Sequence, residues 1–431
     1  MTVYPAPQLA PPAPPARPTA RAARAPRAVA GSAHAWPWRQ LAAYSPLPFR
    51  AAWRAARLGL AGEDSRSRVR ALVRVLYEGD DVRLFGSGTE ALSVALSVAA
   101  TLVGEPGPGV GVVALPAYAC YDVATAAVAA NARIALYDVN PATLAPDLAS
   151  LTTTLAAGAR IVVVAPLYGM PVDWDAIEQC VGKVGAVAVE DAAQGHGARW
   201  RGRPLGSLGR VSVLSFGRGK GWTAGQGGAL VVRGAARLPD GATPDCGRVG
   251  ELRVALSALA QAALGHPAVY GLPAAIPWLH LGETRYREPR EPRCMSRTAA
   301  ALLERTVPLA TEEVERRREN ALILSESFPS RIRVRFIAPL PGGTPGYLRL
   351  PLLRPHGLAG FADPAAAQRL GVAGGYPSTL AALPPVAKRL VRGGRWPGAE
   401  ELVRDLVTLP THSWVGEADR KELLQMLDYG G

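Results

Sequence analysis

The stretch Leu214-Ser215-Phe216-Gly217-Arg218-Gly219-Lys220, followed closely by Gly225-Gln226-Gly227-Gly228, decides how the whole sequence is interpreted. Lysine is scarce in this chain: only four of its 48 basic residues are lysines, and the others are arginines. A coding bias toward arginine explains the scarcity, but it does not explain why a lysine stands in a glycine-rich loop. Unlike arginine, lysine can lose its proton at ordinary pH and then attack a carbonyl group. The stretch therefore predicts a reactive amine at Lys220.

The end of this stretch is similar to a nucleotide-binding P-loop, but the pattern fails twice. The P-loop pattern G-x-x-x-x-G-K-[ST] requires glycine at position 214 and Ser or Thr at position 221. The chain has Leu214 and Gly221 at these positions. The loop is therefore not a phosphate-binding loop of that class.

Composition and charge exclude several classes of protein. The chain has 431 residues, of which 48% are hydrophobic, enough for two or three globular domains. Its net charge of +13 is spread along the chain and comes with no nucleic-acid-binding motif, so no nucleic-acid partner is expected. The four cysteines form no CxxC pair, so neither a metal site nor a disulfide framework is predicted. The N-terminus lacks the apolar core of a secretory signal, and a cytoplasmic location is expected.

The chain divides into three predicted parts. Residues 1–36 are rich in Pro, Ala and Arg, with little to bury, and are expected to be disordered. Residues 37–290 are expected to form a large domain in which helical patterns alternate with short apolar runs, and these runs lie at residues 82–85, 111–115, 132–137, 161–166, 186–190, 211–216 and 229–232. This alternation predicts an α/β fold, with a mostly parallel mixed sheet covered by helices and a ligand site beyond the carboxyl ends of the strands. Residues 291–431 are expected to form a smaller α+β domain, with apolar segments at 332–337, 346–350 and 407–409.

Residues 254–281 carry no formal charge. The segment is long enough to raise the question of a membrane span, but Pro267, Pro273 and Pro277 interrupt it. Two short helices are therefore predicted in place of one span. Three interpretations stay open: a buried core or subunit interface, a peripheral contact with a membrane surface, and a true span.

Two further segments stand at the ends of predicted strands and have the chemistry of a site for pyridoxal phosphate (PLP). Gly86-Ser87-Gly88-Thr89 lies between a strand and a helix, where backbone N–H groups and the helix N-terminus favour an anion. The pair Glu190-Asp191 ends an apolar strand, and buried carboxylates need a cation or hydrogen-bond donors. A protonated pyridine nitrogen would be such a cation for Asp191, and Ser215 is a candidate contact for the phosphate. Taken alone, each segment can also be a plain helix N-cap.

Together these segments resemble the DegT/DnrJ/EryC1/StrS family of PLP-dependent aminotransferases. The matching motifs occur in the same order as in the family. They are SGTEAL at 87–92, PAYAC at 116–120, LYDVNPATL at 136–144, LYGMPVD at 167–173, EDAAQ at 190–194, GSLG at 206–209, SF with Lys220 and GQGG within 215–228, and LPTH at 409–412. No single motif is specific for the family, but the ordered set of motifs is. The resemblance covers roughly residues 40–431.

The resemblance implies a PLP-dependent transferase type I fold, a homodimer, and PLP held on Lys220 as an internal aldimine. By position, Asp191 pairs with the pyridine nitrogen and Gln194 lies near the ring hydroxyl. Ser215 and the Gly88-Thr89 turn hold the phosphate, and the freed Lys220 moves a proton. The implied reaction transfers an amino group from glutamate to a keto-sugar, nucleotide- or lipid-linked, in the biosynthesis of polysaccharides or secondary metabolites.

The chain also departs from the family. Cys120 stands at the cofactor-binding position where an aromatic ring usually covers the cofactor, and Tyr118 and Tyr121 are candidate substitutes. Gln226 replaces the usual acid before Gly-Gly. The GYNYR segment, which reaches the site of the neighbouring subunit, has no clean counterpart, and residues 281–287 are the nearest match.

Three functions are therefore compared. The first is transamination of a sugar-like carbonyl substrate. The second keeps PLP but changes the reaction to a dehydratase, lyase or acyl-transfer step, although a dehydratase relative would carry histidine in place of Lys220. The third is a catalytically silent, membrane-associated relative, which the altered GYNYR segment and the uncharged residues 254–281 favour. Lys220, Asp191 and Gln194 oppose this third function, because nothing structural demands all three.

Overall fold

The structure is a computed structural model that describes residues 38–104, 109–241, 243–279, 282–327 and 334–428. The described residues from Trp38 onward belong to one compact unit. The disorder expected of residues 1–36 lies outside the described residues. The predicted boundary between residues 290 and 291 stays a prediction.

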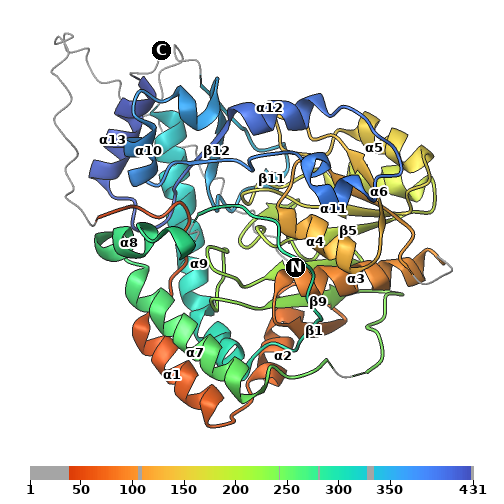
Figure 1. Cartoon of the computed structure of the whole chain (residues 1–431), viewed down its shortest axis with the longest axis horizontal. Helices are drawn as coiled ribbons and strands as arrows, with labels where there is room; N and C mark the ends of the chain where they lie inside the picture. The colour runs from red at the N-terminus through yellow and green to blue at the C-terminus, as the bar shows by residue number, and fades with distance from the viewer. Residues whose placement is uncertain (1–37, 105–108, 242, 280–281, 328–333, 429–431) are drawn as a thin grey trace, which may run out of the picture. The chain divides into compact units, whose positions relative to one another are not determined.

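A seven-stranded sheet forms the centre of the large unit (Figure 1). In spatial order its strands are β1 (Asp81–Phe85), β9 (Gly228–Val232), β8 (Val211–Ser215), β5 (Val187–Asp191), β4 (Ile161–Val164), β2 (Val112–Pro116) and β3 (Arg133–Tyr137). Neighbouring strands from β8 to β3 are parallel, and β9 runs antiparallel to both β8 and β1. Each of the seven predicted apolar runs forms one of these strands, which confirms the mostly parallel mixed sheet.

Helices cover both faces of this sheet, because successive side chains of a strand point to opposite faces. Along β4, Val163 belongs to the core shared with α3 and α4, whereas Val162 and Val164 belong to the core shared with α1, α2, α5 and α6. The helices are α1 (Phe49–Leu60), α2 (Arg66–Leu76), α3 (Gly88–Leu102), α4 (Tyr121–Ala129), α5 (Leu148–Ala156) and α6 (Trp174–Gly182). Helix α5 lies in a stretch for which the sequence patterns predict no helix.

The long helix α9 (Arg297–Glu326) connects two cores. Its first turns, including Ala299 and Leu303, pack in the core with α1 and α2, and Leu324 near its end packs in a third core. Its N-terminus is capped by the Ser296 hydroxyl and by the carboxylate of Glu251, which accepts hydrogen bonds from the first two N–H groups of the helix. An anionic side chain at this end is favoured by the helix dipole.

The C-terminal residues build a second sheet against the third core. Its order is β10 (Arg335–Phe336), β12 (Leu350–Leu353), β14 (Leu406–Leu409) and β13 (Ala373–Gly374), and a separate three-stranded sheet contains β11 (Gly343–Thr344), β6 (Arg199–Trp200) and β7 (Arg203–Pro204). The helices of this part are α10 (Pro364–Arg369), α11 (Pro384–Ala387), α12 (Pro397–Asp405) and α13 (Glu417–Asp428), with 3-10 turns at Gly357–Gly360 and Leu380–Ala382.

Two of the three apolar segments predicted in this part lie in strands, within the described residues. The segment at 332–337 contains β10, and the segment at 407–409 lies in β14. The segment at 346–350 reaches a strand only at its last residue, because β12 begins at Leu350. Tyr347 has a φ of 43°, and this left-handed conformation cannot continue an extended strand.

The uncharged segment forms α8 (Pro267–Ala274) and most of α7 (Gly247–Leu264), followed by a 3-10 turn at Pro277–Leu279. The prediction of two helices in place of one is confirmed, although α7 begins well before residue 254. Among the described residues, no helix has both the length and the apolar content to cross a bilayer. One face of α7 is buried through Val254 and Ala258, and the other is exposed through Leu256 and Leu264.

A buried histidine makes stability depend on pH. His412 is fully buried, and its Nε2 lies 2.9 Å from the carbonyl oxygen of Leu41. Burial lowers the pKa of His412 to about 3 from its usual value of 6.5. Below pH 6.5 the unfolded chain binds a proton at this ring and the folded protein does not. The stabilisation is therefore complete above that pH and is lost as the pH falls toward 3.

We expect His412 to make the free energy of unfolding fall by about 1.4 kcal/mol for each pH unit between pH 6 and pH 4. Urea unfolding across this range measures the slope. In His412→Gln, which keeps an N–H donor near Leu41, the slope should be shallower by about that amount. An unchanged slope in the variant would show that this ring is not the responsible group.

Candidate active site

Segments far apart in the sequence meet at one cavity, beyond the carboxyl ends of the strands. Its walls are formed by Gly88, Thr89, Leu92, Cys120, Asp122, Val123, Ala165, Pro166, Leu167, Asp191, Ala193, Gln194, Ser215 and Lys220. All seven residues that the sequence proposes for the site stand in this wall. The amine of Lys220 and the carboxylate of Asp191 therefore share one cavity.

The two adjacent carboxylates at the end of β5 have different environments. Glu190 is fully buried, and its carboxylate accepts hydrogen bonds from the backbone N–H groups of Gly206 (2.6 Å), Leu208 (2.9 Å) and Gly209 (3.2 Å) and from the Ser212 hydroxyl (2.8 Å). These four donors replace water around the buried charge. Glu190 is thus a structural anchor for the turn at residues 206–209.

Asp191 is the carboxylate of the pair that lines the cavity. It accepts a hydrogen bond from the N–H of Ala193 at 3.1 Å, and no helix begins there, so it is not a helix N-cap. Burial raises the pKa of Asp191, and the nearby charge of Lys220 acts in the opposite direction. A cation placed in the cavity would stabilise the charged form of this carboxylate.

Close backbone packing brings Gly88 and Thr89, at the N-terminus of α3, to Ser215 beside these groups, and we name these three residues the anion cradle because a helix N-terminus favours an anion. A Cβ on Gly88 would lie 2.7 Å from the Cβ of Ser215, and a Cβ on Gly228 would lie 2.6 Å from the N of Gly88. Only glycine permits this approach of the α3 N-terminus to the ends of β8 and β9. Ser87 caps α3 by accepting a hydrogen bond from the N–H of Glu90. The residues of this region that line the cavity are Gly88, Thr89 and Ser215.

Residues from outside the motifs hold the Lys220 loop in place. The Ser45 hydroxyl donates a hydrogen bond to the carbonyl oxygen of Lys220. Arg317 of α9 is fully buried and donates to Ser45 Oγ at 2.8 Å and to the Tyr44 carbonyl oxygen at 2.6 Å. Burial lowers the pKa of Arg317 to about 10, against the opposing charge of Glu313, so the guanidinium stays charged at neutral pH. Sequence reasoning missed Ser45 and Arg317, because neither belongs to a motif.

Comparison with known families gives a match at residues 79–237, to the DegT/DnrJ/EryC1/StrS aminotransferase family. The match covers this region of the chain and not the rest of it. The predicted resemblance is confirmed. The match contains the α3 N-terminus, both carboxylates of β5 and the whole Lys220 loop.

Curated relatives are similar to this chain over part of their length. The L-glutamine:2-deoxy-scyllo-inosose aminotransferase of Streptoalloteichus tenebrarius is 30% identical over 239 residues, which are 56% of this chain and 50% of the relative. The 3-amino-5-hydroxybenzoate synthase of Amycolatopsis mediterranei is 33% identical over 157 residues, 36% of this chain and 37% of the relative. The chain thus spans half or less of the length of these curated relatives.

Solved structures share the fold over nearly their whole length. A DegT DnrJ EryC1 StrS aminotransferase from Brucella abortus has a TM-score of 0.68 at 19% identity, covering 89% of this chain and 95% of the other. The aminotransferase TlmJ from Streptoalloteichus hindustanus has a TM-score of 0.68 at 24% identity, covering 91% and 98%. These likenesses confirm the predicted PLP-dependent transferase type I fold.

The departure from the family at Cys120 is visible in the cavity. Burial raises the pKa of the Cys120 thiol to about 12, so the thiol is neutral at pH 7. Tyr118, a candidate substitute, accepts a hydrogen bond from the N–H of Tyr376 (2.8 Å), and Tyr121 pairs with the Ser378 hydroxyl (2.6 Å). Among the described residues, Cys120 is the only one of the three candidates in the wall beside Lys220.

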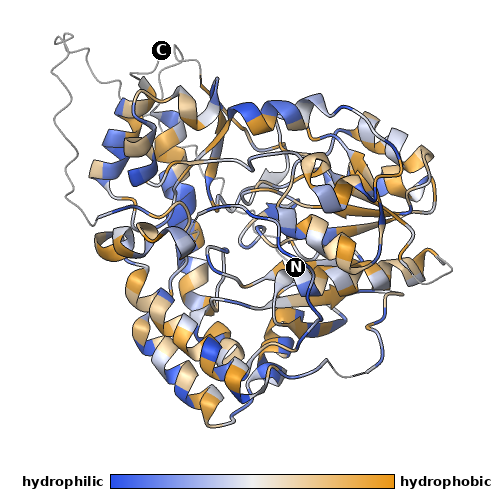
Figure 2. Ribbon diagram, viewed as in Figure 1, coloured by the Kyte–Doolittle hydropathy of each residue, from blue (hydrophilic) through white to orange (hydrophobic). Residues whose placement is uncertain are grey.

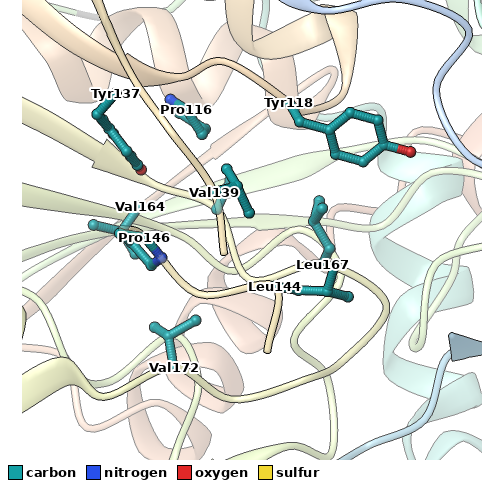
Figure 3. Close-up of a pocket in the computed structure, with 10 residues that line it drawn as sticks. Pro116, Tyr118, Tyr137, Val139, Leu144, Pro146, Val164, Leu167 and Val172 are labelled. Atoms are coloured by element: carbon teal, nitrogen blue, oxygen red, sulfur yellow. The ribbon is translucent and has the colours of Figure 1, made fainter. Parts of the chain in front are cut away.

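Tyr118 borders a second, small apolar cavity next to the sheet (Figure 3). The side chains around it include Tyr137, Val164 and Val172, and the Tyr118 hydroxyl points away from them. Its wall contains no acidic or basic side chain. The cavity with Lys220 is therefore the candidate active site.

Sequence reasoning also missed two residues near Lys220. Asp122 lines the cavity, and its charge contributes to the raised pKa of Asp191 and of Cys120. Tyr376 comes from the C-terminal part, and its hydroxyl accepts a hydrogen bond from Gln194 Nε2 at 2.9 Å. Asp122 follows the PAYAC word and was open to detection, whereas Tyr376 lies 182 residues from Gln194 and carries no local signal.

The two carboxylates of β5 should respond differently to removal of their charge. In Glu190→Gln an amide NH₂ would face the N–H donors of the 206–209 turn, and we expect the free energy of unfolding to fall by about 1–3 kcal/mol. In Asp191→Asn we expect no loss of stability, because burial opposes the Asp191 charge. Urea unfolding of both variants at pH 7 tests this contrast, and equal losses would refute the separate roles.

Proposed function

We propose that this chain is a PLP-dependent aminotransferase that transfers an amino group from an α-amino acid to the ketone of a sugar-like ring. The observation that carries the proposal is the shared cavity of Lys220 and Asp191, with the anion cradle of Ser215 and the α3 N-terminus in the same wall. The names of curated relatives support the reaction class, since several are aminotransferases for inososes. The proposal places the enzyme in the cytoplasm as a homodimer.

The residues present fit PLP. PLP requires a carboxylate for its pyridine nitrogen, an amine for its aldehyde and an anion cradle for its phosphate. In this order, the three are supplied within one cavity by Asp191, Lys220 and Ser215. Gly88 brings the N-terminus of α3 close to Ser215, and the backbone N–H groups there would face the phosphate. When bound, PLP supplies an electron sink that stabilises negative charge on the carbon next to the amine nitrogen.

Each neighbouring residue would have a defined task. Asp191 would keep the pyridine nitrogen protonated, because a carboxylate in this buried place gains from a cation partner. Gln194 would lie near the ring hydroxyl, with its amide oriented by the Tyr376 hydroxyl and by the N–H of Tyr168. The neutral thiol of Cys120 would border the ring without competing for the aldehyde.

Lys220 would be the proton-transfer residue. Its Nζ would take a proton from the α-carbon of the amino donor and, in the second half-reaction, return a proton to the former carbonyl carbon of the acceptor. Such transfer requires a fixed direction of approach. Ser45 and Arg317 would provide it by holding the backbone of the loop.

The substrates follow from the same comparison. The resemblance implies glutamate as the amino donor, whereas the printed names of relatives specify L-glutamine. The acceptor would be a ketone on a ring bearing hydroxyl groups. No observation favours a dehydratase or lyase, and Lys220 stands where a dehydratase relative would carry histidine.

A half-reaction assay tests the proposal. The protein purified with PLP should show a visible absorption band, and L-glutamate or L-glutamine should remove it without any acceptor. Lys220→Arg should lose the lysine-linked band and slow donor conversion by about 10²–10⁴-fold, because proton transfer is lost. Lys183→Arg, an exposed lysine at the end of α6, is the matched control and should behave as the unaltered protein.

Two results would reject the aminotransferase. One is a protein that stays colourless when PLP is supplied in excess. The other is a Lys220→Arg variant that converts the donor to its keto acid at the normal rate.

A further inference from the structure

An apolar surface without a partner runs along two neighbouring helices. It consists of Phe49, Trp53 and Leu60 on α1 and of Val249, Leu252 and Leu256 on α7, and each of these side chains is between 48% and 76% exposed. The spacing of three, four or seven residues places each set on one stripe of its helix. The two helices pack side by side, and Figure 2 shows hydrophobic residues along both (Figures 1 and 2). We name these six side chains the α1–α7 surface.

Apolar surface of this extent marks an interaction site in a globular protein. The opposite faces of both helices are already used by the core, through Ala52 and Ala55 on α1 and Val254 and Ala258 on α7. The exposed stripes are therefore not required to hold the helices in the fold. The exposed Trp278 on the 3-10 turn after α8 extends the apolar character beyond α7.

The exposed charges on α1 and α7 themselves have one sign, and the acids Glu63, Asp64 and Asp245 lie just beyond the ends of these helices. Exposed arginines flank the stripes, and these are Arg50, Arg54, Arg57, Arg248 and Arg253. Helix α1 contains no acidic residue, and the single acid of α7, Glu251, is buried at the N-terminus of α9. Within the described ranges, none of the five arginines takes part in an ion pair.

This charge discriminates between the possible partners. Across a two-fold axis on this surface, a second copy would place the arginine-bearing faces of the same two helices against one another, and neither helix carries an exposed acid to compensate. An anionic bilayer supplies the missing charge, and Trp, Phe and Leu beside Arg are the residues by which helices lie in a membrane interface. We propose that the α1–α7 surface docks this protein onto an anionic lipid bilayer, with both helices lying along the membrane.

Helix α7 also packs against the loop that follows Lys220. A Cβ on Gly225, in the loop after Lys220, would be 3.0 Å from Nε2 of Gln261 on α7. The docking proposal does not depend on the aminotransferase activity, because vesicle binding is measured without substrate. Failure of one proposal therefore leaves the other standing.

Vesicle co-sedimentation of the full-length protein, purified with PLP, tests the docking. We expect binding to vesicles of phosphatidylcholine mixed with phosphatidylglycerol, weaker binding to phosphatidylcholine alone, and weakening by salt. Replacing Leu256 with serine should reduce the partition coefficient about tenfold, because a leucine side chain leaves the interface. Val249→Ser should also weaken binding, whereas Val75→Ser on α2 should not, although both valines are 76% exposed.

Two controls distinguish docking through the α1–α7 surface from binding through the N-terminal tail and from self-association. The tail contains four arginines, Arg17, Arg21, Arg24 and Arg27, and the variant with glutamine at all four should keep its dependence on Leu256. Light scattering of Leu256→Ser should give the same oligomeric state as the unaltered protein. The proposal is overturned if anionic vesicles do not bind the protein, if the tail arginines account for all binding, or if Leu256→Ser changes oligomeric state and not vesicle binding.

Discussion

Two adjacent carboxylates must be buried at the end of one central strand, and much of the site is arranged around this constraint. A strand turns successive side chains to opposite faces, so Glu190 and Asp191 cannot be stabilised by the same partners. Glu190 collects three backbone N–H groups and the Ser212 hydroxyl, and in doing so fixes the 206–209 turn. Asp191 faces the cavity, where the charge of Lys220 offsets part of its burial. Glu190 thus stabilises the scaffold. The buried carboxylate of Asp191 would be stabilised by a further cation, and a protonated pyridine would be such a cation.

The remaining parts of the site are held by contacts that cross the molecule. The anion cradle exists because glycine at positions 88 and 228 lets the α3 N-terminus touch the ends of two strands. The lysine loop is held from its other side by Ser45 and by a buried guanidinium on α9. An amine, a carboxylate and a cradle for an anion are therefore presented to one cavity by separately anchored elements. Rigid support of this kind is what a proton-transfer residue needs, because its geometry decides its rate.

Local sequence patterns predicted the sheet and the cavity wall well. They did not predict the residues that hold the site through contacts distant in sequence. The seven apolar runs became seven strands because fully buried strands read as continuous Val, Ala and Leu segments. The motif words placed Gly88, Asp191 and Lys220 at strand ends, and the parallel topology brings such ends to one edge. Arg317 and Tyr376 were missed, since their roles arise from contacts with residues distant in sequence. The suggestion that Tyr118 or Tyr121 replaces the missing aromatic stays a prediction; in the fold, the hydroxyl of Tyr118 accepts a hydrogen bond from the backbone N–H of Tyr376. Nor did the uncharged segment reveal that α1 contributes half of the exposed apolar surface.

Chemical trapping of the bound cofactor shows directly whether Lys220 and Asp191 hold PLP between them. The protein has four lysines, Lys183, Lys220, Lys388 and Lys421, so the attachment site is decided among few candidates. Borohydride reduction of the PLP-loaded protein makes the bond between PLP and a lysine side chain permanent. Peptide mapping by mass spectrometry then locates the modified lysine. We expect a pyridoxyl group on Lys220, and a marked loss of labelling in Asp191→Asn at limiting PLP. A label on another lysine, or labelling of Lys220 that is indifferent to Asp191, would contradict it.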